Sequence, residues 1–138
     1  MSWQYYGLFL DNNTRNKLLE FVNNYEGTKE AMKIANKIYL DHCTLLHKSQ
    51  CDAGSTKVLN TLLLLSSNYT TEMIITHIGI SRKAIAFKVT NIENLCANEI
   101  PHITIATFDN GKPVDSNNIK SWFELEESIK IVGTLKKV

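Results

Sequence analysis

The chain has 138 residues and a formal net charge of +1, from 15 basic and 14 acidic side chains. Its length predicts a single domain spanning residues 1–138, because domains usually contain about 100–150 residues. A nearly neutral chain is unsuited to coating long nucleic acids or an anionic membrane surface, since both need an excess of lysine and arginine. The longest purely apolar run, 62–65, is far shorter than the ~20 residues of a membrane helix.

The three cysteines, Cys43, Cys51 and Cys96, are an odd number and form no C-x-x-C pair. This pattern favours free thiols over a disulfide framework. It also argues against a zinc site built mainly on thiolates. The first residues show neither a basic cap nor a cleavable apolar run, so we expect no secretion signal and a cytoplasmic location.

Strands and helices alternate in the first half of the chain. Aromatic and branched side chains predict a strand over 3–10. Residues 11–14 read Asp-Asn-Asn-Thr, a run of helix N-cap residues, and the apolar spacing after it predicts a helix to about Tyr25. The following elements are expected to be a short helix over 29–36, a strand over 37–47, a loop over 50–55 and a buried leucine-rich helix over 55–66.

Strands predominate in the second half. Two apolar runs, 73–80 and 84–90, flank Ser-Arg-Lys and predict a hairpin. Further strands are expected over 100–108 and 128–135, and a helix capped by 115–117 is expected to run through Phe123. The whole pattern predicts an α+β domain in which each half contributes a helix and several strands.

Two of the four histidines occur in the same local sequence. Residues 42–45 read His-Cys-Thr-Leu and residues 102–105 read His-Ile-Thr-Ile, so both fit His-x-Thr-aliphatic. Each motif lies in a predicted strand, where alternate side chains share a face. The histidine and the threonine of each motif therefore point the same way, and the residues between and after them point to the core.

Two such strands side by side would place two imidazoles and two hydroxyls in one groove. This arrangement suits phosphodiester hydrolysis, because one of His42 and His102 can take a proton while the other gives one to the leaving oxygen. Thr44 and Thr104, with nearby backbone N–H groups, can hold the non-bridging phosphate oxygens. The chemistry needs no metal and no other cofactor, and the sequence leaves open which histidine is the acid.

Two further histidines fit other roles. Residues 47–49 read His-Lys-Ser, but a glutamine follows, and strand alternation places His47 on the face opposite to His42. His77 is flanked by isoleucines and is expected to be a structural histidine.

Two other residues are candidates for contact with a substrate. Lys48 lies just beyond the first motif and can meet a phosphate. Tyr5 and Tyr6 alternate on the first strand, so one faces the core and the other can stack on a base; we assign the substrate contact to Tyr6.

The motifs and their context resemble the two-histidine (2H) phosphoesterase superfamily and, more narrowly, the cyclic phosphodiesterase domain of fungal-type tRNA ligases. The matching segments are 6–11, 42–48, 98–107 and 112–117. The resemblance implies a bilobal fold with two antiparallel sheets, related by pseudo-twofold symmetry around a central groove and flanked by helices. It also implies that the motif histidines form the acid–base pair and that the motif threonines bind phosphate.

The expected function is metal-independent hydrolysis of a nucleotide phosphodiester, either a 2′,3′-cyclic phosphate or a short or cyclic oligonucleotide. Members of the superfamily open 2′,3′-cyclic phosphates, and some relatives cleave 2′,5′-linked or cyclic oligonucleotide immune signals. A viral or phage enzyme that degrades such signals in the host cytoplasm is therefore one alternative.

A second alternative is a binding protein of the same fold that sequesters a nucleotide without cleaving it. A third, an RNA-binding protein, is disfavoured by the balanced charge. The expected partner is a small nucleotide, a cyclic oligonucleotide or an RNA end, bound by a monomer that does not contact a membrane.

Overall fold

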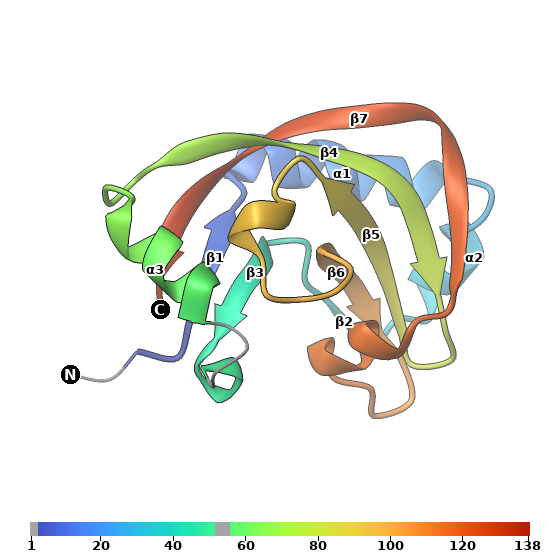
Figure 1. Cartoon of the computed structure of the whole chain (residues 1–138). Helices are drawn as coiled ribbons and strands as arrows, with labels where there is room; N and C mark the ends of the chain where they lie inside the picture. The colour runs from blue at the N-terminus through green and yellow to red at the C-terminus, as the bar shows by residue number, and fades with distance from the viewer. Residues whose placement is uncertain (1–2, 52–55) are drawn as a thin grey trace.

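The computed structural model describes residues 3–51 and 56–138 of the chain. Strands and helices alternate through this part, and short 3-10 helices (η) connect several of them (Figure 1). In chain order the elements are β1 (Tyr5–Phe9), α1 (Asn12–Asn24), α2 (Lys29–Lys33), β2 (Lys37–Ile38), β3 (His42–His47), η1 (Lys48–Gln50), α3 (Thr56–Leu64), β4 (Thr70–Ile80), β5 (Ala84–Thr90), η3 (Glu93–Leu95), β6 (His102–Thr107), η4 (Pro113–Asn118) and β7 (Ser121–Lys137).

The strands form a single antiparallel sheet with the order β2-β6-β3-β1-β7-β4-β5. β5 also pairs with β6, so the sheet closes on itself as a barrel (Figure 1). We expected two separate sheets, but two contacts join them. The 17-residue β7 pairs with both β1 and β4, and β3 pairs with β6. The α+β class is confirmed, and the sheet is one rather than two.

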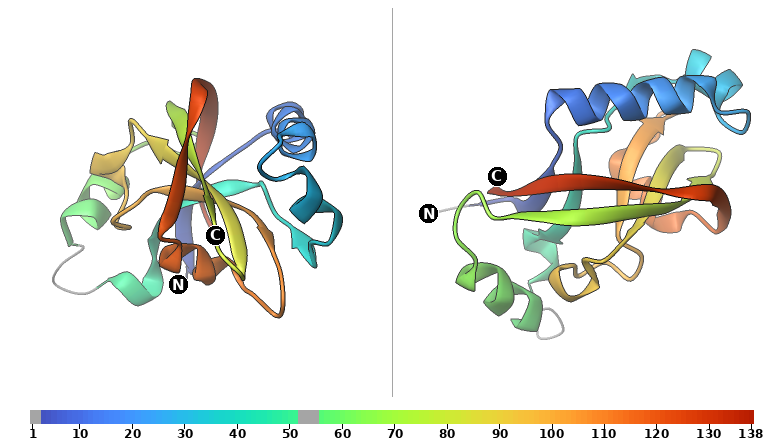
Figure 2. Two further views of the ribbon diagram at one scale, coloured as in Figure 1. Left: turned by 90° about the vertical axis from the view of Figure 1, so that its right-hand side faces the viewer. Right: turned by 90° about the horizontal axis from the view of Figure 1, so that it is seen from above.

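One face of the sheet packs against the helices. A single core cluster joins Leu18 and Val22 of α1 and Leu62 of α3 to buried side chains of the strands. The rings of Phe21 in α1 and Phe87 in β5 lie 6.3 Å apart between centroids. Figure 2 shows α1 running roughly parallel to the long β4 and β7 strands. These helices therefore do not cover the opposite face of the central strands.

The start of α1 agrees with the sequence prediction. The side chain of Asp11 accepts a hydrogen bond from the backbone N–H of Thr14 at 2.7 Å, as an N-cap residue does. This hydrogen bond holds the pKa of the Asp11 carboxyl below its usual value. The carboxylate therefore stabilises the first turn of the helix that covers the core.

The strand predicted over 37–47 is broken in the structure. Leu40 adopts a left-handed conformation with φ 50° and is fully buried. The backbone N–H groups of Tyr39 and Leu40 donate to carbonyl oxygens of β6. The chain therefore turns at Leu40, which separates the short β2 from β3 and places Asp41 directly before the first motif.

The helix predicted to reach Phe123 is much shorter. η4 ends at Asn118, and Trp122 and Phe123 belong to β7, which pairs with β4 in this region. Trp122 lies over Gly79 of β4, where a Cβ atom would be 2.5 Å from the indole ring. Pairing with β4 and packing on Gly79 thus extend the predicted strand 128–135 to 121–137.

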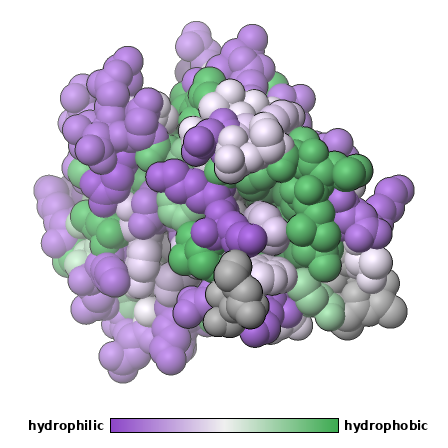
Figure 3. Space-filling model, turned by 90° about the vertical axis from the view of Figure 1, so that its left-hand side faces the viewer, coloured by the Kyte–Doolittle hydropathy of each residue, from purple (hydrophilic) through white to green (hydrophobic). Residues whose placement is uncertain are grey.

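The leucine-rich helix is amphipathic rather than buried. Leu62 is 1% exposed, whereas Leu63 and Leu64 are 61% and 87% exposed. Hydrophobic side chains are visible on the side of the molecule that carries α3 (Figure 3). The helix predicted over 29–36 ends at Lys33, and most of the predicted loop 50–55 lies outside the described residues.

The predicted hairpin of β4 and β5 is confirmed. The backbone N–H of Ser81 donates to the carbonyl oxygen of Ala84 at 2.9 Å, which closes the turn. No helix within 3–51 or 56–138 is long and apolar enough to cross a membrane.

Candidate active site

The pairing of β3 with β6 brings the two His-x-Thr motifs together. Cys43 lies directly across from Ile103, and both side chains are fully buried. In an antiparallel pair the flanking residues then face each other in crossed order, so each motif histidine lies across from the other motif's threonine. The alternation predicted from the sequence therefore places all four polar side chains on the face opposite to the core.

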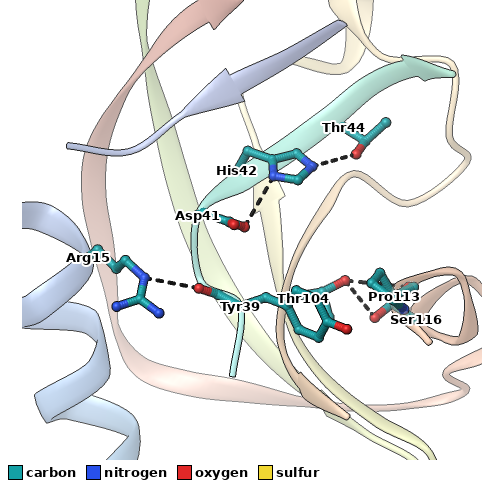
Figure 4. Close-up of polar contacts among 8 residues, drawn as sticks. All are labelled: Arg15, Tyr39, Asp41, His42, Thr44, Thr104, Pro113 and Ser116. Atoms are coloured by element: carbon teal, nitrogen blue, oxygen red, sulfur yellow. Dashed lines mark hydrogen bonds and ion pairs between the residues drawn. The ribbon is translucent and has the colours of Figure 1, made fainter. Parts of the chain in front are cut away.

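His42 is held by polar groups on both sides of its ring. Its Nδ1 lies 3.2 Å from Oδ1 of Asp41, and its Nε2 lies 3.1 Å from the hydroxyl oxygen of Thr44 (Figure 4). The hydrogen bond with His42 holds the pKa of the Asp41 carboxyl below its usual value. With this carboxylate accepting the Nδ1 proton, Nε2 is the nitrogen that faces the threonine.

Two aromatic rings of β1 pack against the same imidazole. The centroid of the His42 ring lies 5.0 Å from that of Tyr5 and 4.8 Å from that of Phe9, with interplanar angles of 22° for both pairs. Gly7 lies between the two aromatic residues, and a Cβ atom there would be 3.2 Å from both the His42 and the Phe9 ring. The absence of a side chain at Gly7 thus leaves room for the His42 ring.

Tyr6, to which we assigned a substrate contact, does not lie on the motif face. Tyr6 is only 6% exposed and belongs to the hydrophobic core. Tyr5 points to the motif face and stacks on His42. Burial and the negative charge of Asp41 raise the pKa of the Tyr5 hydroxyl. The prediction that one tyrosine faces each side is confirmed, but the orientation is the reverse of our assignment.

His102 has different surroundings from His42. It is 9% exposed, and its Nδ1 lies 2.8 Å from the carbonyl oxygen of Ile100. A carbonyl oxygen can only accept, so Nδ1 carries the proton and Nε2 of the neutral ring carries a lone pair. Burial lowers the pKa of His102 and the nearby His42 lowers it further, against the opposing effect of the Ile100 hydrogen bond.

Thr104 is positioned by η4. Its hydroxyl oxygen lies 2.9 Å from that of Ser116 and 3.5 Å from the carbonyl oxygen of Pro113 (Figure 4). Ser116 is only 2% exposed, so its buried hydroxyl orients the side chain of Thr104. The sequence showed Ser116 only as part of a helix-capping run, and its contact with the second motif depends on the tertiary fold.

A β-bulge in β3 changes the orientation of His47. Tyr6 pairs with Leu46 but Gly7 pairs with Thr44, so Leu45 is an extra residue, and both leucines are buried. His47 is therefore turned to the face of His42, contrary to the prediction from simple alternation. Its Nδ1 accepts the backbone N–H of Ser49 at 3.1 Å and caps η1.

Two lysines that the sequence did not single out lie on the motif face. Lys88 of β5 is directly across from His102. Lys136 of β7 is across from Gly7, and its Nζ lies 5.4 Å from the centroid of the Phe9 ring. Lys48, which we did predict, is exposed in η1 just after the first motif. Only the pairing register identifies the first two, because no local pattern marks them.

Strand register places the site, and two surface hollows lie elsewhere on the described part of the chain. One surface hollow, about 470 Å³, lies along α1 and another, about 410 Å³, lies between α2 and the β4–β5 turn, and no motif residue lines either. Within the described residues there is no cluster of three or more His, Cys, Asp or Glu side chains that could hold a metal ion.

Residues 29–134 match the sequence profile of the fungal tRNA ligase phosphodiesterase domain. The match covers well over half of the chain and includes both motifs. The chain belongs to the fungal tRNA ligase phosphodiesterase domain family. The resemblance inferred from the motifs is thereby confirmed.

A solved structure supports the fold of this phosphodiesterase domain. The chain is similar to the protein in a structure titled "Crystal Structure of Fungal RNA Kinase", with a TM-score of 0.68 and 18% sequence identity. The similarity covers 98% of this chain and 45% of that chain, so the present domain spans less than half of the other protein. At this identity the similarity shows the fold alone. No curated protein matches the chain.

Proposed function

We propose that the protein hydrolyses a nucleotide phosphodiester, with a 2′,3′-cyclic phosphate at an RNA end as the leading substrate. The observation that carries this proposal is the register of β3 and β6, which sets each motif histidine across from the other motif's threonine. Membership of a phosphodiesterase domain family supports the same class of chemistry.

The surroundings of His102 suit a general base. Its pKa is lowered mainly by burial, so the ring is neutral at neutral pH. Its Nδ1 proton is committed to the carbonyl oxygen of Ile100, so the lone pair is on Nε2. We assign to this nitrogen the removal of a proton from the attacking water.

The complementary role of general acid then belongs to His42. As the water oxygen bonds to phosphorus, the bond from phosphorus to one ribose oxygen breaks, and Nε2 of His42 gives that oxygen a proton. The products are a phosphomonoester and a free ribose hydroxyl. One imidazole must be neutral and the other charged, so the activity should depend on pH with a bell-shaped profile.

The two threonine hydroxyls are proposed to hold the phosphate. Ser116 can donate to the Thr104 oxygen, and the Thr104 hydrogen, which points to the carbonyl oxygen of Pro113 at 3.5 Å, would turn to a non-bridging oxygen when the phosphate binds. Thr44 fulfils the same role on the other strand. The crossed placement of the motifs also supports a pseudo-twofold relation between the halves that carry β3 and β6, and we propose this symmetry for the fold.

The proposed reaction needs no metal ion, because the imidazoles supply the proton transfers and the hydroxyls supply the phosphate contacts. We expect full activity in EDTA. A strict requirement for a divalent cation would contradict this mechanism.

The test is turnover of a short RNA that ends in a 2′,3′-cyclic phosphate. We expect His42→Ala and His102→Ala each to reduce the rate by roughly 10²-fold or more, with the folded state retained by circular dichroism. His47→Ala, which removes an imidazole outside both motifs, is the matched control and should stay close to the wild type.

Full activity of either motif variant would overturn the assignment. Cyclic and 2′,5′-linked oligonucleotides are assayed in parallel, since degradation of oligonucleotide signals is the alternative use of the same chemistry. Recovery of every ligand unchanged after long incubation would instead indicate a nucleotide-binding protein.

A further inference from the structure

The face that carries the two motifs continues onto β5 and β4. Lys88 lies directly across from His102 in the pairing of β5 with β6. His77 lies directly across from Lys88 in the pairing of β4 with β5. Directly opposed residues of an antiparallel pair share a face of the sheet, so these three side chains form one row across three strands.

A β-bulge brings His77 into this row. Simple alternation along β4 would place it on the side of the buried Ile75. The register shifts between Ile75 and His77, and Ile78 takes the buried position instead. Bulges that redirect a side chain are common beside functional sites. The isoleucine neighbours predicted a structural histidine, but the bulge turns His77 to the motif face.

Lys88 is a half-buried cation without an acidic partner. Its ammonium group forms no ion pair or hydrogen bond with residues 3–51 or 56–138. A lysine can pack its aliphatic stem against the sheet while its charged end stays accessible to an anion. Glu124 of β7 lies across from His77 and is the acidic residue at the far end of the row. The row therefore places an unpaired positive charge beside His102.

The neighbouring positions of β5 are not available to a ligand. Ala84 and Ala86 are fully buried beneath Ile119 and Trp122, which follow η4. Lys88 is two positions further along the same face and is the first uncovered residue of β5 beside His102. A ligand that binds at the motifs and extends from β6 over β5 would therefore contact Lys88 first.

We propose that Lys88, with His77 beside it, forms a second phosphate subsite that holds the phosphate next to the reacting one. The substrate is then a nucleotide chain of at least two residues rather than a cyclic mononucleotide. This inference rests on the proposed function, since it names the substrate of that same site.

The strand spacing supports a separate subsite. Neighbouring strands lie about 4.8 Å apart, and a lysine side chain extends its charge beyond its own strand. Lys88 is one strand removed from His102 and two strands, about 10 Å, from Thr44, so its ammonium group is placed to contact a phosphate that adjoins the one held between His102 and Thr44. A substrate with a second phosphate can use that charge.

The test compares two substrates with the same terminal nucleotide, a 2′,3′-cyclic mononucleotide and a trinucleotide that ends in the same cyclic phosphate. Lys88→Met keeps the aliphatic stem and removes the charge. We expect it to raise KM for the trinucleotide by roughly tenfold, as the loss of a charge-assisted hydrogen bond does, and to leave the mononucleotide unchanged. The slope of log affinity against log salt should fall by about 0.7.

Two variants control the experiment. Lys83→Met removes a lysine at the exposed β4–β5 turn and should leave both substrates unchanged. Lys88→Arg keeps the positive charge and should retain most of the preference for the trinucleotide. An equal loss on both substrates, or no loss on either, would overturn the second subsite.

A binding measurement separates this inference from the proposed function. Fluorescence anisotropy with a 2′-O-methyl trinucleotide 3′-phosphate needs no turnover. Weaker binding of this probe to Lys88→Met, with unchanged binding of the matching mononucleotide 3′-phosphate, supports the subsite even if the wild type hydrolyses neither substrate. Equal affinity of wild type and variant for the trinucleotide would contradict it.

Discussion

Similar motifs place His42 and His102 in different surroundings, and this difference is the basis of the roles that we propose for them. His42 packs against two aromatic rings and is hydrogen-bonded to a carboxylate. His102 is almost buried and is hydrogen-bonded to a backbone carbonyl. A neutral, buried imidazole suits proton removal, and a ring beside a carboxylate suits proton delivery. The asymmetry is our basis for proposing a direction of proton transfer that the motifs alone leave open.

Burial of His102 makes a prediction about acid stability. Its pKa in the folded protein lies below the ordinary value of 6.5. As pH falls through 6.5 the unfolded chain binds a proton that the folded protein does not, so the free energy of unfolding decreases. The stability associated with the neutral ring is present above pH 6.5 and is lost below it.

His102→Gln should reduce this loss, because glutamine does not titrate and its amide can still donate to Ile100. We expect urea denaturation to show a smaller fall in the free energy of unfolding between about pH 7 and pH 5 in the variant than in the wild type. Equal falls would show that His102 titrates normally. In the wild type the acidic limb of kcat/KM should also lie below pH 6.5.

At the scale of single residues, sequence spacing identifies the site residues whose orientation depends only on local strand alternation. The two His-x-Thr motifs were recognised because strand alternation is a local rule, and that rule places them correctly. Ser116 and Lys88 could not be found in this way, because the packing of η4 sets the contact of Ser116 with Thr104 and the pairing of β5 with β6 sets the position of Lys88. Tyr6 was assigned to the site because alternation shows that neighbouring residues face opposite sides but does not show which side is buried.

At the scale of elements, β1 supports the first motif through Gly7. The rings of His42 and Phe9 lie next to Gly7, and a Cβ atom at this position would be 3.2 Å from each ring. We expect Gly7→Val to displace the His42 ring and to reduce kcat at least roughly tenfold, since small misplacements of a catalytic group have large effects on rate.

The strand itself should survive this change, because valine favours strands. Overpacking is expected to lower the free energy of unfolding by about 1–3 kcal/mol. Two-dimensional NMR of the histidine side chains should show a shift of His42 with little change at His102. Wild-type kcat together with an unmoved His42 signal would show that Gly7 has no part in positioning the ring.

Bulges explain the elements whose orientation was predicted wrongly. In β3 the extra residue Leu45 buries two successive leucines and turns His47 to the motif face. In β4 a similar shift turns His77. Both bulges occur within apolar runs where alternation is already obscured, so no local pattern reveals them.

At the scale of the whole molecule, closure of the sheet brings the two halves together. Long pairing of β7 with both β1 and β4 fixes one side of the barrel. The contact of β3 with β6 then joins strands that lie about sixty residues apart in the chain. The sequence predicted the strands and the α+β class. It could not predict the single closed sheet, because β7 was recognised only over its central and C-terminal part.

The central claim is that the two motifs act as one unit on one phosphate. The most direct measurement is kcat/KM for the wild type, His42→Ala, His102→Ala and the double variant, on radiolabelled RNA with a 2′,3′-cyclic end in EDTA. Residues that act in one step give strongly non-additive losses. We predict that the double variant is about as active as the slower single variant. Losses that multiply in the double variant would show that the histidines act independently, and would contradict the account.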